Sequence, residues 1–265
     1  MLYIAFWCCV SGLNAQTATI VPSTFAAGDA SVARQGEWFA FHNPALLASE
    51  NKVSASAIYE NRFSMKELST QAISFACPTS LVNVGVAVSH FGYSNYSELL
   101  AGITFARTFD KWLTIGVQFN YYSVNFSNSV GSKGAVLAQI GLLSQVTPDF
   151  FVGFNAFNPT RQKVQYQDIV RDIPSVFSLG VMYRFTDELK WLAQVDKEIS
   201  SDPIWKTGFE YQPVSVFIVR IGGYGAPFIP TLGAGVKWQN FNFDVNFERH
   251  PSLGITSIGV LRYVF

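Results

Sequence analysis

The sequence has 265 residues, of which 49% are apolar and only 14% are charged, and its 18 Lys and Arg residues balance 18 Asp and Glu residues. The lack of a basic excess excludes a nucleic-acid-binding protein, because phosphates are neutralised by basic side chains, and the apolar content excludes an intrinsically disordered chain. No run of about 18 apolar residues follows the N-terminus, which excludes a helical membrane protein and leaves a closed β-barrel as the way for so apolar a chain to span a membrane.

Residues 1–15 are predicted to be a cleaved export signal. An apolar stretch over residues 2–10 leads to Leu13-Asn14-Ala15, which resembles a small-residue cleavage site ahead of Gln16. Because neither Lys nor Arg precedes the apolar stretch, a buried first strand is the alternative interpretation. Together with a membrane-spanning barrel, an export signal predicts that the protein lies in the bacterial outer membrane.

The three cysteines give no indication of a disulfide or a metal site. Cys8 and Cys9 leave with the signal, and the bulky Phe6 and Trp7 before Cys8 argue against a lipoprotein signal, which has small residues there. A single remaining cysteine, Cys77, makes neither an intrachain disulfide nor a CxxC site. We interpret Cys77 as a small apolar residue of a strand.

Residues 16–51 do not alternate like a strand. They consist of short blocks rich in small residues, and Pro44 interrupts the second block. A barrel of about fourteen strands has a lumen too wide for its own side chains to fill. We therefore predict that residues 16–51 form a hatch or plug in the lumen, and that residues 52–265 form a transmembrane antiparallel β-barrel.

From residue 52 onward, apolar and polar residues alternate with the period of a strand. Leu113, Ile115, Val117, Phe119 and Tyr121, for example, alternate with Thr114, Gly116, Gln118 and Asn120. The pattern predicts fourteen strands, at 52–61, 70–77, 81–90, 97–108, 112–125, 133–146, 149–157, 175–186, 188–198, 204–212, 214–224, 230–239, 241–249 and 252–265. The number is even, as is usual for single-chain bacterial barrels.

A soluble β-sandwich would show the same alternation, but two features favour the barrel. The polar face is rich in Gly and other small residues, which suits a crowded interior. Aromatic residues lie near the ends of the expected strands, as in the girdles at membrane interfaces; they are Tyr59, Trp112, Tyr121, Trp191, Trp205, Tyr211, Trp238 and Tyr263.

The lengths of the connections predict the orientation of the barrel. Connections after even strands are short, while several after odd strands are longer, at 62–70, 91–96, 126–132 and 158–174; His250-Pro251 is a short exception. Outer-membrane barrels have short periplasmic turns and longer external loops. The alternation therefore predicts a periplasmic N-terminus.

The C-terminus has the pattern of a last barrel strand. Leu261, Tyr263 and Phe265 occupy alternate positions that would face outward, and the chain ends on the aromatic residue. This ending resembles the C-terminal strand of bacterial outer-membrane barrels, so we assign these three residues to assembly of the barrel.

Catalytic chemistry is sparse in the sequence. His42, His90 and His250 have no second ligand at a metal-binding spacing, and the one adjacent pair, Ser89-His90, would point to opposite faces of a strand. We expect neither an enzyme nor a cofactor or metal site.

Inward-facing strand positions carry charges of both signs. They are Arg184, Lys190, Asp196, Lys206, Glu210, Arg220, Lys237, Asp244, Glu248 and Arg262. Unpaired charges inside a barrel would be costly, so we expect an ion-pair network that holds the plug. The alternative, an ion-selective pore, normally needs one dominant sign.

One stretch carries a family resemblance. The small-residue block Ala27-Gly28-Asp29-Ala30, followed by Asn43-Pro44-Ala45-Leu46-Leu47 and the first strand, resembles the FadL-like outer-membrane barrels, and within them the PorV/PorQ branch of the Bacteroidetes. The resemblance implies fourteen strands and an N-terminal hatch. From residue chemistry alone, Asn43, Pro44 and Ala45 are expected to form the turn that leads from plug to wall, with contact to a ligand as the alternative.

The resemblance implies two candidate functions. The first is a non-enzymatic component or partner of a protein secretion or surface-assembly complex of the type IX kind. The alternative is FadL-like passive transport of hydrophobic small molecules, which usually needs large external loops; here only the connection at 158–174 is long, and it is polar. We expect outer-membrane lipid, the barrel-assembly machinery and other outer-membrane or secreted proteins as partners.

Overall fold

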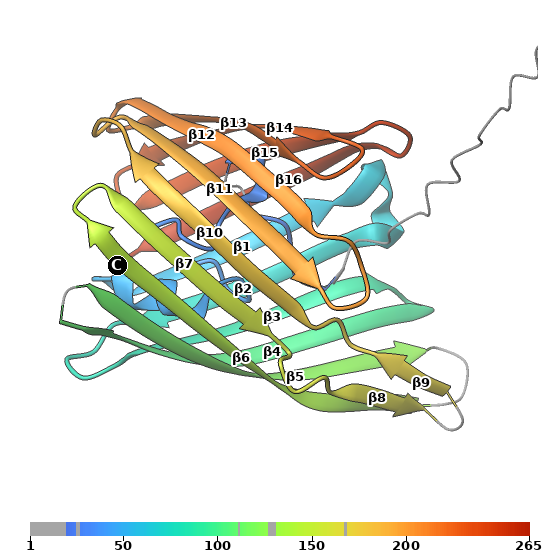
Figure 1. Cartoon of the computed structure of the whole chain (residues 1–265). Helices are drawn as coiled ribbons and strands as arrows, with labels where there is room; N and C mark the ends of the chain where they lie inside the picture. The colour runs from blue at the N-terminus through green and yellow to red at the C-terminus, as the bar shows by residue number, and fades with distance from the viewer. Residues whose placement is uncertain (1–19, 25–26, 111, 127–130, 167–168) are drawn as a thin grey trace, which may run out of the picture.

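A computed structural model describes residues 20–24, 27–110, 112–126, 131–166 and 169–265. Fourteen antiparallel strands form a closed barrel (Figure 1). They are β1 (Ser54–Asn61), β2 (Ser69–Cys77), β3 (Asn83–Tyr93), β4 (Tyr96–Phe109), β5 (Leu113–Phe126), β6 (Gly131–Thr147), β7 (Phe150–Phe157), β10 (Val176–Arg184), β11 (Leu189–Glu198), β12 (Ile204–Val214), β13 (Phe217–Tyr224), β14 (Ile229–Trp238), β15 (Phe241–His250) and β16 (Gly254–Val264). The predicted barrel and its strand number are confirmed.

The barrel closes where its first and last strands meet. β1 pairs with β16 in a register that joins Ser54 to Val264 and Asn61 to Ser257. Every other strand pairs with its neighbours along the chain, except that β7 pairs with β10. The two intervening strands, β8 (Lys163–Tyr166) and β9 (Ile169–Asp172), form a separate hairpin within the long connection. The sequence pattern had predicted only a loop there.

The two ends of the barrel differ in their connections. The turn end, on the left in Figure 1, carries the β4–β5, β6–β7, β12–β13 and β14–β15 turns, of two or three residues each. The opposite loop end carries residues 158–175 and the β8–β9 hairpin. The loop expected at 91–96 is wrong, because β3 and β4 extend to Tyr93 and Tyr96 and leave a two-residue turn.

Apolar side chains cover the outside of the wall. On β5, Phe119 and Tyr121 are exposed, while Gln118 and Asn120, which alternate with them, face inward and are almost completely buried. Exposed aromatic side chains lie near both ends of the barrel, Tyr59 and Trp205 near the loop end and Trp112 and Trp238 near the turn end. No helix in the described part of the chain is long and apolar enough to cross a membrane.

Residues 20–24 and 27–50, here called the luminal segment, lie inside the barrel (Figure 1). The segment contains two short 3₁₀ helices, η1 (Ala27–Asp29) and η2 (Pro44–Ser49). Its first residues lie near the loop end, where Ser89 donates to the Ile20 carbonyl oxygen at 2.6 Å. Its last residue, Glu50, lies near the turn end beside Arg262. The segment therefore crosses the lumen along its length, and the expected export signal lies outside the described residues.

Glycines in the wall allow the luminal segment to approach the strands closely. A Cβ atom at Gly116 on β5 would lie 2.3 Å from the Ala45 nitrogen, and one at Gly222 on β13 would lie 2.4 Å from the Gly28 nitrogen. The main buried apolar cluster therefore lies between segment and wall. It includes Trp38, Phe41, Leu46 and Leu47 of the segment and Leu100, Leu137, Phe151 and Met182 of the wall.

Candidate functional site

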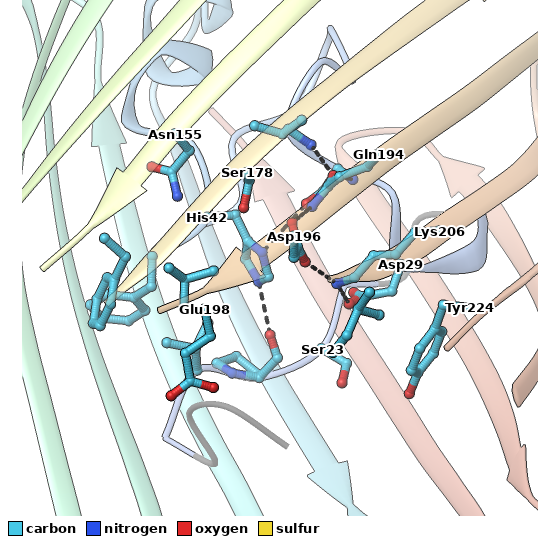
Figure 2. Close-up of a pocket in the computed structure, with 18 of the residues that line it drawn as sticks. Ser23, Asp29, His42, Asn155, Ser178, Gln194, Asp196, Glu198, Lys206 and Tyr224 are labelled. Carbon is cyan, nitrogen blue, oxygen red and sulfur yellow. Dashed lines mark hydrogen bonds and ion pairs between the residues drawn. The ribbon is translucent and has the colours of Figure 1, made fainter. Parts of the chain in front are cut away.

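A cavity of about 170 Å³ lies between the luminal segment and the wall towards the loop end (Figure 2). The wall side comes from β7, β10, β11, β12 and β13, and residues 21–23, 29–32 and 41–42 of the luminal segment form the other side. We call this cavity the luminal pocket. Because strand alternation sends every second side chain inward, neighbouring strands present Asn155, Ser178, Gln194 and Lys206 to the same space.

Lys206 on β12 joins the luminal segment to the wall. Its Nζ atom lies 2.6 Å from Oδ2 of Asp29 and 2.8 Å from Oδ2 of Asp196 on β11. The other oxygen of Asp29 accepts hydrogen bonds from the backbone and hydroxyl of Thr24, at 2.7 and 2.8 Å. Lys206 is therefore neutralised by two carboxylates and is not available to attract a free anion.

His42 forms part of the floor of the pocket. Its Nε2 lies 2.9 Å from the carbonyl oxygen of Pro22, which can only accept, so Nε2 carries the proton. Its Nδ1 then accepts from the Ser31 hydroxyl at 3.4 Å. Burial lowers the pKa of His42, although the charge of Asp29 acts in the opposite direction. The imidazole is therefore neutral at pH 7, and it holds two parts of the luminal segment together.

Gln194 on β11 gives the luminal segment a second attachment beside the pocket. Its side-chain oxygen accepts from the backbone nitrogens of Ser31 and Val32, each at 2.9 Å. Its amide nitrogen donates to Asp196 at 2.6 Å. The side chain that fixes the segment thus also orients one of the carboxylates beside Lys206.

The side of the pocket formed by β7 and β10 is apolar with two hydrogen-bonding groups. Phe157 and Val176 provide the apolar surface, and Ile204 on β12 adds to it. Asn155 and Ser178 are buried and line the same space (Figure 2). This combination suits a molecule with an apolar body and at least one polar group.

Asn158 joins the two ends of the long connection at the loop-end side of the pocket. Its side-chain nitrogen donates to the carbonyl oxygen of Ile173 at 3.0 Å, and its own carbonyl oxygen accepts from the Ser175 hydroxyl at 2.7 Å. Its backbone nitrogen donates to the carbonyl oxygen of Ala138 on β6. The two ends of the long connection are thus tied together directly above Phe157 and Val176.

A second group of charges lies deeper in the lumen. Arg34 of the luminal segment forms an ion pair with Glu210 on β12, and Arg220 on β13 lies 3.6 Å from the same carboxylate. Arg220 also pairs with Asp244 on β15 at 2.6 Å. All four side chains are at most 6% exposed. These alternating charges therefore connect the luminal segment to β12 and continue along the wall to β15.

A third group lies near the turn end. Glu37 lies 2.9 Å from Arg34 and 3.8 Å from Arg262 on β16, which also pairs with Glu50. Burial would raise the pKa of Glu37, but the positive charges of Arg34 and Arg262 lower it to about 2. Glu37 is therefore ionised at neutral pH and connects two arginines.

Four of the ten inward charges expected from the sequence lie apart from these groups. Arg184 is 4.0 Å from Asp149, and Glu248 accepts from the Tyr224 hydroxyl at 2.9 Å. Lys190 is half-buried opposite Glu210, and Lys237 is exposed at the turn end. The other six, Asp196, Lys206, Glu210, Arg220, Asp244 and Arg262, lie in the ion-paired groups.

The sequence pattern missed the partners that come from the luminal segment and its neighbourhood. These are Asp29, Arg34, Glu37 and Glu50, together with the Glu60–Arg62 pair, which lies 2.9 Å apart and holds Ser23. Strand periodicity cannot locate them, because most lie in a segment without periodic structure. The one signal in the sequence that could have indicated these partners was the presence of charged residues in the segment expected to lie in the lumen.

Asn43, Pro44 and Ala45 lie within the lumen. Asn43 is completely buried; its side-chain oxygen accepts from the Ala45 nitrogen at 3.0 Å, and its amide donates to the carbonyl oxygens of Val32 and of Leu142 on β6. Pro44 begins η2, where its missing N–H costs nothing. Asn43 therefore caps η2, which begins with Pro44 and Ala45, and the chain enters the wall later, after Glu50, and not at the turn expected from the sequence.

The remaining candidate residues lie on the surface or at strand ends. Leu261 and Phe265 are exposed on the outside of the barrel, and Tyr263 contacts Phe265 edge-on, with ring centroids 4.8 Å apart. His90 is exposed, and His250 accepts backbone hydrogen bonds in the β15–β16 connection. Within the described residues, no cluster of His, Cys, Asp and Glu could hold a metal ion.

No family model matches the sequence, and a search of curated proteins gave no match. Among solved structures, the toluene transporter TbuX of Ralstonia pickettii is similar with a TM-score of 0.67 and 13% identity, over 91% of this chain and 97% of that one. A FadL homologue of Pseudomonas aeruginosa gives 0.62 and 13%, over 94% and 98%. The toluene transporter TodX of Pseudomonas putida gives 0.61 and 10%, over 91% and 95%. At such low identity the likeness shows the fold alone, a barrel that this chain shares with these proteins.

Proposed function

We propose that this chain is an outer-membrane transporter that admits small molecules through the luminal pocket. The observation that carries the proposal is a pocket of about 170 Å³ between the luminal segment and the wall near the loop end. The barrels with the same fold are described as toluene transporters and a FadL homologue, which supports a transport function.

The outer surface supports a place in the membrane. Phe119, Phe209 and Phe247 are among the many large apolar side chains exposed on the outside of the wall. In water such a surface would cause aggregation, whereas in a bilayer it faces lipid. The loop end, with the β8–β9 hairpin, is then external, and the turn end is periplasmic.

The size of the pocket limits the solute. An apolar cavity of about 150 Å³ in another protein holds one benzene molecule, so a cavity of about 170 Å³ suits one ring with a small substituent. Below the pocket, the ion pairs of Arg34, Glu210 and Arg220 occupy the lumen. The chain is therefore proposed to pass single small molecules and not to form an open pore.

Uptake by intact cells tests this proposal. Cells whose outer membrane contains the chain are expected to take up radiolabelled benzyl alcohol at micromolar concentration faster than cells with an empty vector. The same initial rate in both would contradict it. The barrel must first be shown to be folded in the outer membrane by its heat-modifiable migration on gels.

A secretion or surface-assembly partner of the PorV/PorQ type remains a second candidate. It is favoured by the connections between barrel strands, which have at most seven residues apart from 158–175, and by a luminal segment attached along its whole length. The sequence pattern ranked this function first, whereas the similar structures favour transport. Native mass spectrometry after gentle extraction separates the two, because a secretion partner predicts a stoichiometric protein complex and a transporter predicts a lone barrel.

A further inference from the structure

We infer that the luminal pocket selects small amphiphilic cations, namely organic amines with one apolar ring or a body of similar size, over the corresponding carboxylates. This inference rests on the proposed transport function and specifies the solute. The charges that line the pocket favour such a solute over a purely hydrophobic one.

The charged lining of the pocket is negative. Four carboxylates line it against two cations; they are Asp29, Asp196, Glu198 and Asp202 against Arg62 and Lys206. Both cations are already neutralised. Lys206 is held by Asp29 and Asp196, and Arg62 lies 2.9 Å from Glu60. The group of Lys206, Asp29 and Asp196 keeps one negative charge, and Glu198 and Asp202 add two more that no cation of the described lining balances.

Glu198 and Asp202 lie at the loop-end side of the pocket, where a solute would arrive first. Glu198 ends β11 and is half-buried, and Asp202 is exposed in the connection to β12. Glu198 accepts from the Ser200 and Ser201 hydroxyls at 3.1 and 2.9 Å, which orient its carboxylate without neutralising it. In the part of the chain that the structure describes, neither carboxylate forms an ion pair.

The rest of the lining accommodates the uncharged part of such a molecule. Phe157, Val176 and Ile204 offer apolar contact, and Asn155 and Ser178 can bond a hydroxyl or amide substituent. Figure 2 shows Glu198 beside the same space as Asn155 and Ser178. An amine can thus place its ammonium group near Glu198 and its ring against Phe157, whereas a carboxylate would meet two like charges.

Three solutes of similar size that differ in charge test the inference. Binding of benzylamine, benzyl alcohol and benzoate to the full-length folded protein is measured by isothermal titration calorimetry at low salt. An exposed charge pair contributes up to about 1 kcal/mol, which corresponds to about a fivefold change in affinity, so the expected preference for benzylamine over benzoate is about fivefold. Added salt should reduce this preference, because the rim carboxylates are accessible to solvent.

Two double variants identify the source of the preference. E198Q/D202N is expected to reduce the preference for benzylamine over benzoate while the affinity for benzyl alcohol is unchanged. D187N/E188Q, which neutralises two exposed carboxylates at the turn end, should leave the order unchanged.

Equal binding of benzylamine and benzoate to the wild type, or a preference of undiminished size in E198Q/D202N, would overturn the inference. If benzyl alcohol still bound in that case, transport through the pocket would stand and only the charge selection would fail. If none of the three solutes bound, both the inference and the pocket as a solute site would be overturned.

Discussion

The Nζ atom of Lys206 lies 2.6 Å from the Asp29 carboxylate, although the two residues are 177 positions apart in the sequence. Through this contact a strand of the wall holds the luminal segment beside the pocket. The side chains are each 12% exposed, so water screens the pair only slightly.

Replacing Lys206 with Met should release the luminal segment. The change leaves Asp29 and Asp196 close together without a cation, and removing one partner of a buried ion pair typically costs about 3–5 kcal/mol. We expect frequent channel openings in planar bilayers, and we expect low or no steady conductance of the wild type. K197M on β11 is the control, because Lys197 is exposed. A silent K206M channel would contradict the prediction.

Replacing Asn43 with Ala should destabilise the luminal segment more than P44A does. Asn43 makes three hydrogen bonds from a completely buried side chain, and loss of buried partners costs about 1–3 kcal/mol for each group left unsatisfied. Limited proteolysis of the folded barrel should cut N43A within the luminal segment. The exposed Asn240 provides the control variant N240A, and resistance equal to that of the wild type in N43A would refute this role.

A side chain at Gly116 should displace η2 from the wall. Any Cβ there lies 2.3 Å from the Ala45 nitrogen, which is too close for two non-bonded atoms. G116V is therefore expected to lower the heat-modification temperature of the barrel, whereas G259V should not, since nothing lies within 4 Å of a Cβ at Gly259. Equal temperatures for the two variants would show that the close approach is unimportant.

Acidification should loosen the luminal segment. The pKa of Glu37 is lowered to about 2 in the folded protein, so its ion pairs stabilise the fold fully above the unfolded pKa, about 4.5. This contribution is lost progressively as the pH falls from there towards 2. Bilayer conductance should rise over that range and change less in E37Q. An equal rise of conductance in the wild type and E37Q would show that titratable groups other than Glu37 cause the effect.

The barrel could be predicted from the sequence because strand periodicity is a local signal. Phe119 and Gln118 already indicate which face is outside, and fourteen repeats of that pattern locate the strands. The limits of β3 and β4 were missed because Gly92 and Tyr93 resemble a loop but continue the ladder. The hairpin β8–β9 was missed because its strands have only four residues each, too few for the periodicity to stand out.

The site was harder to predict than the wall. Asp196 and Lys206 could be assigned to the lumen by alternation, but the approach of Asp29 and His42 depends on how a segment without periodicity crosses the barrel. The role of Gly116 and Gly222 as contact surfaces also requires the three-dimensional structure. Sequence alone therefore indicated an interior of mixed charge but not its pocket.

Uptake of radiolabelled benzyl alcohol by cells that carry S178W or L179W tests the central claim most directly. Ser178 faces the luminal pocket, whereas Leu179, its neighbour on β10, is 51% exposed on the outer surface. Transport through the pocket predicts that S178W reduces uptake to the empty-vector rate while L179W retains the wild-type rate. Wild-type uptake in a correctly folded S178W barrel would contradict the account.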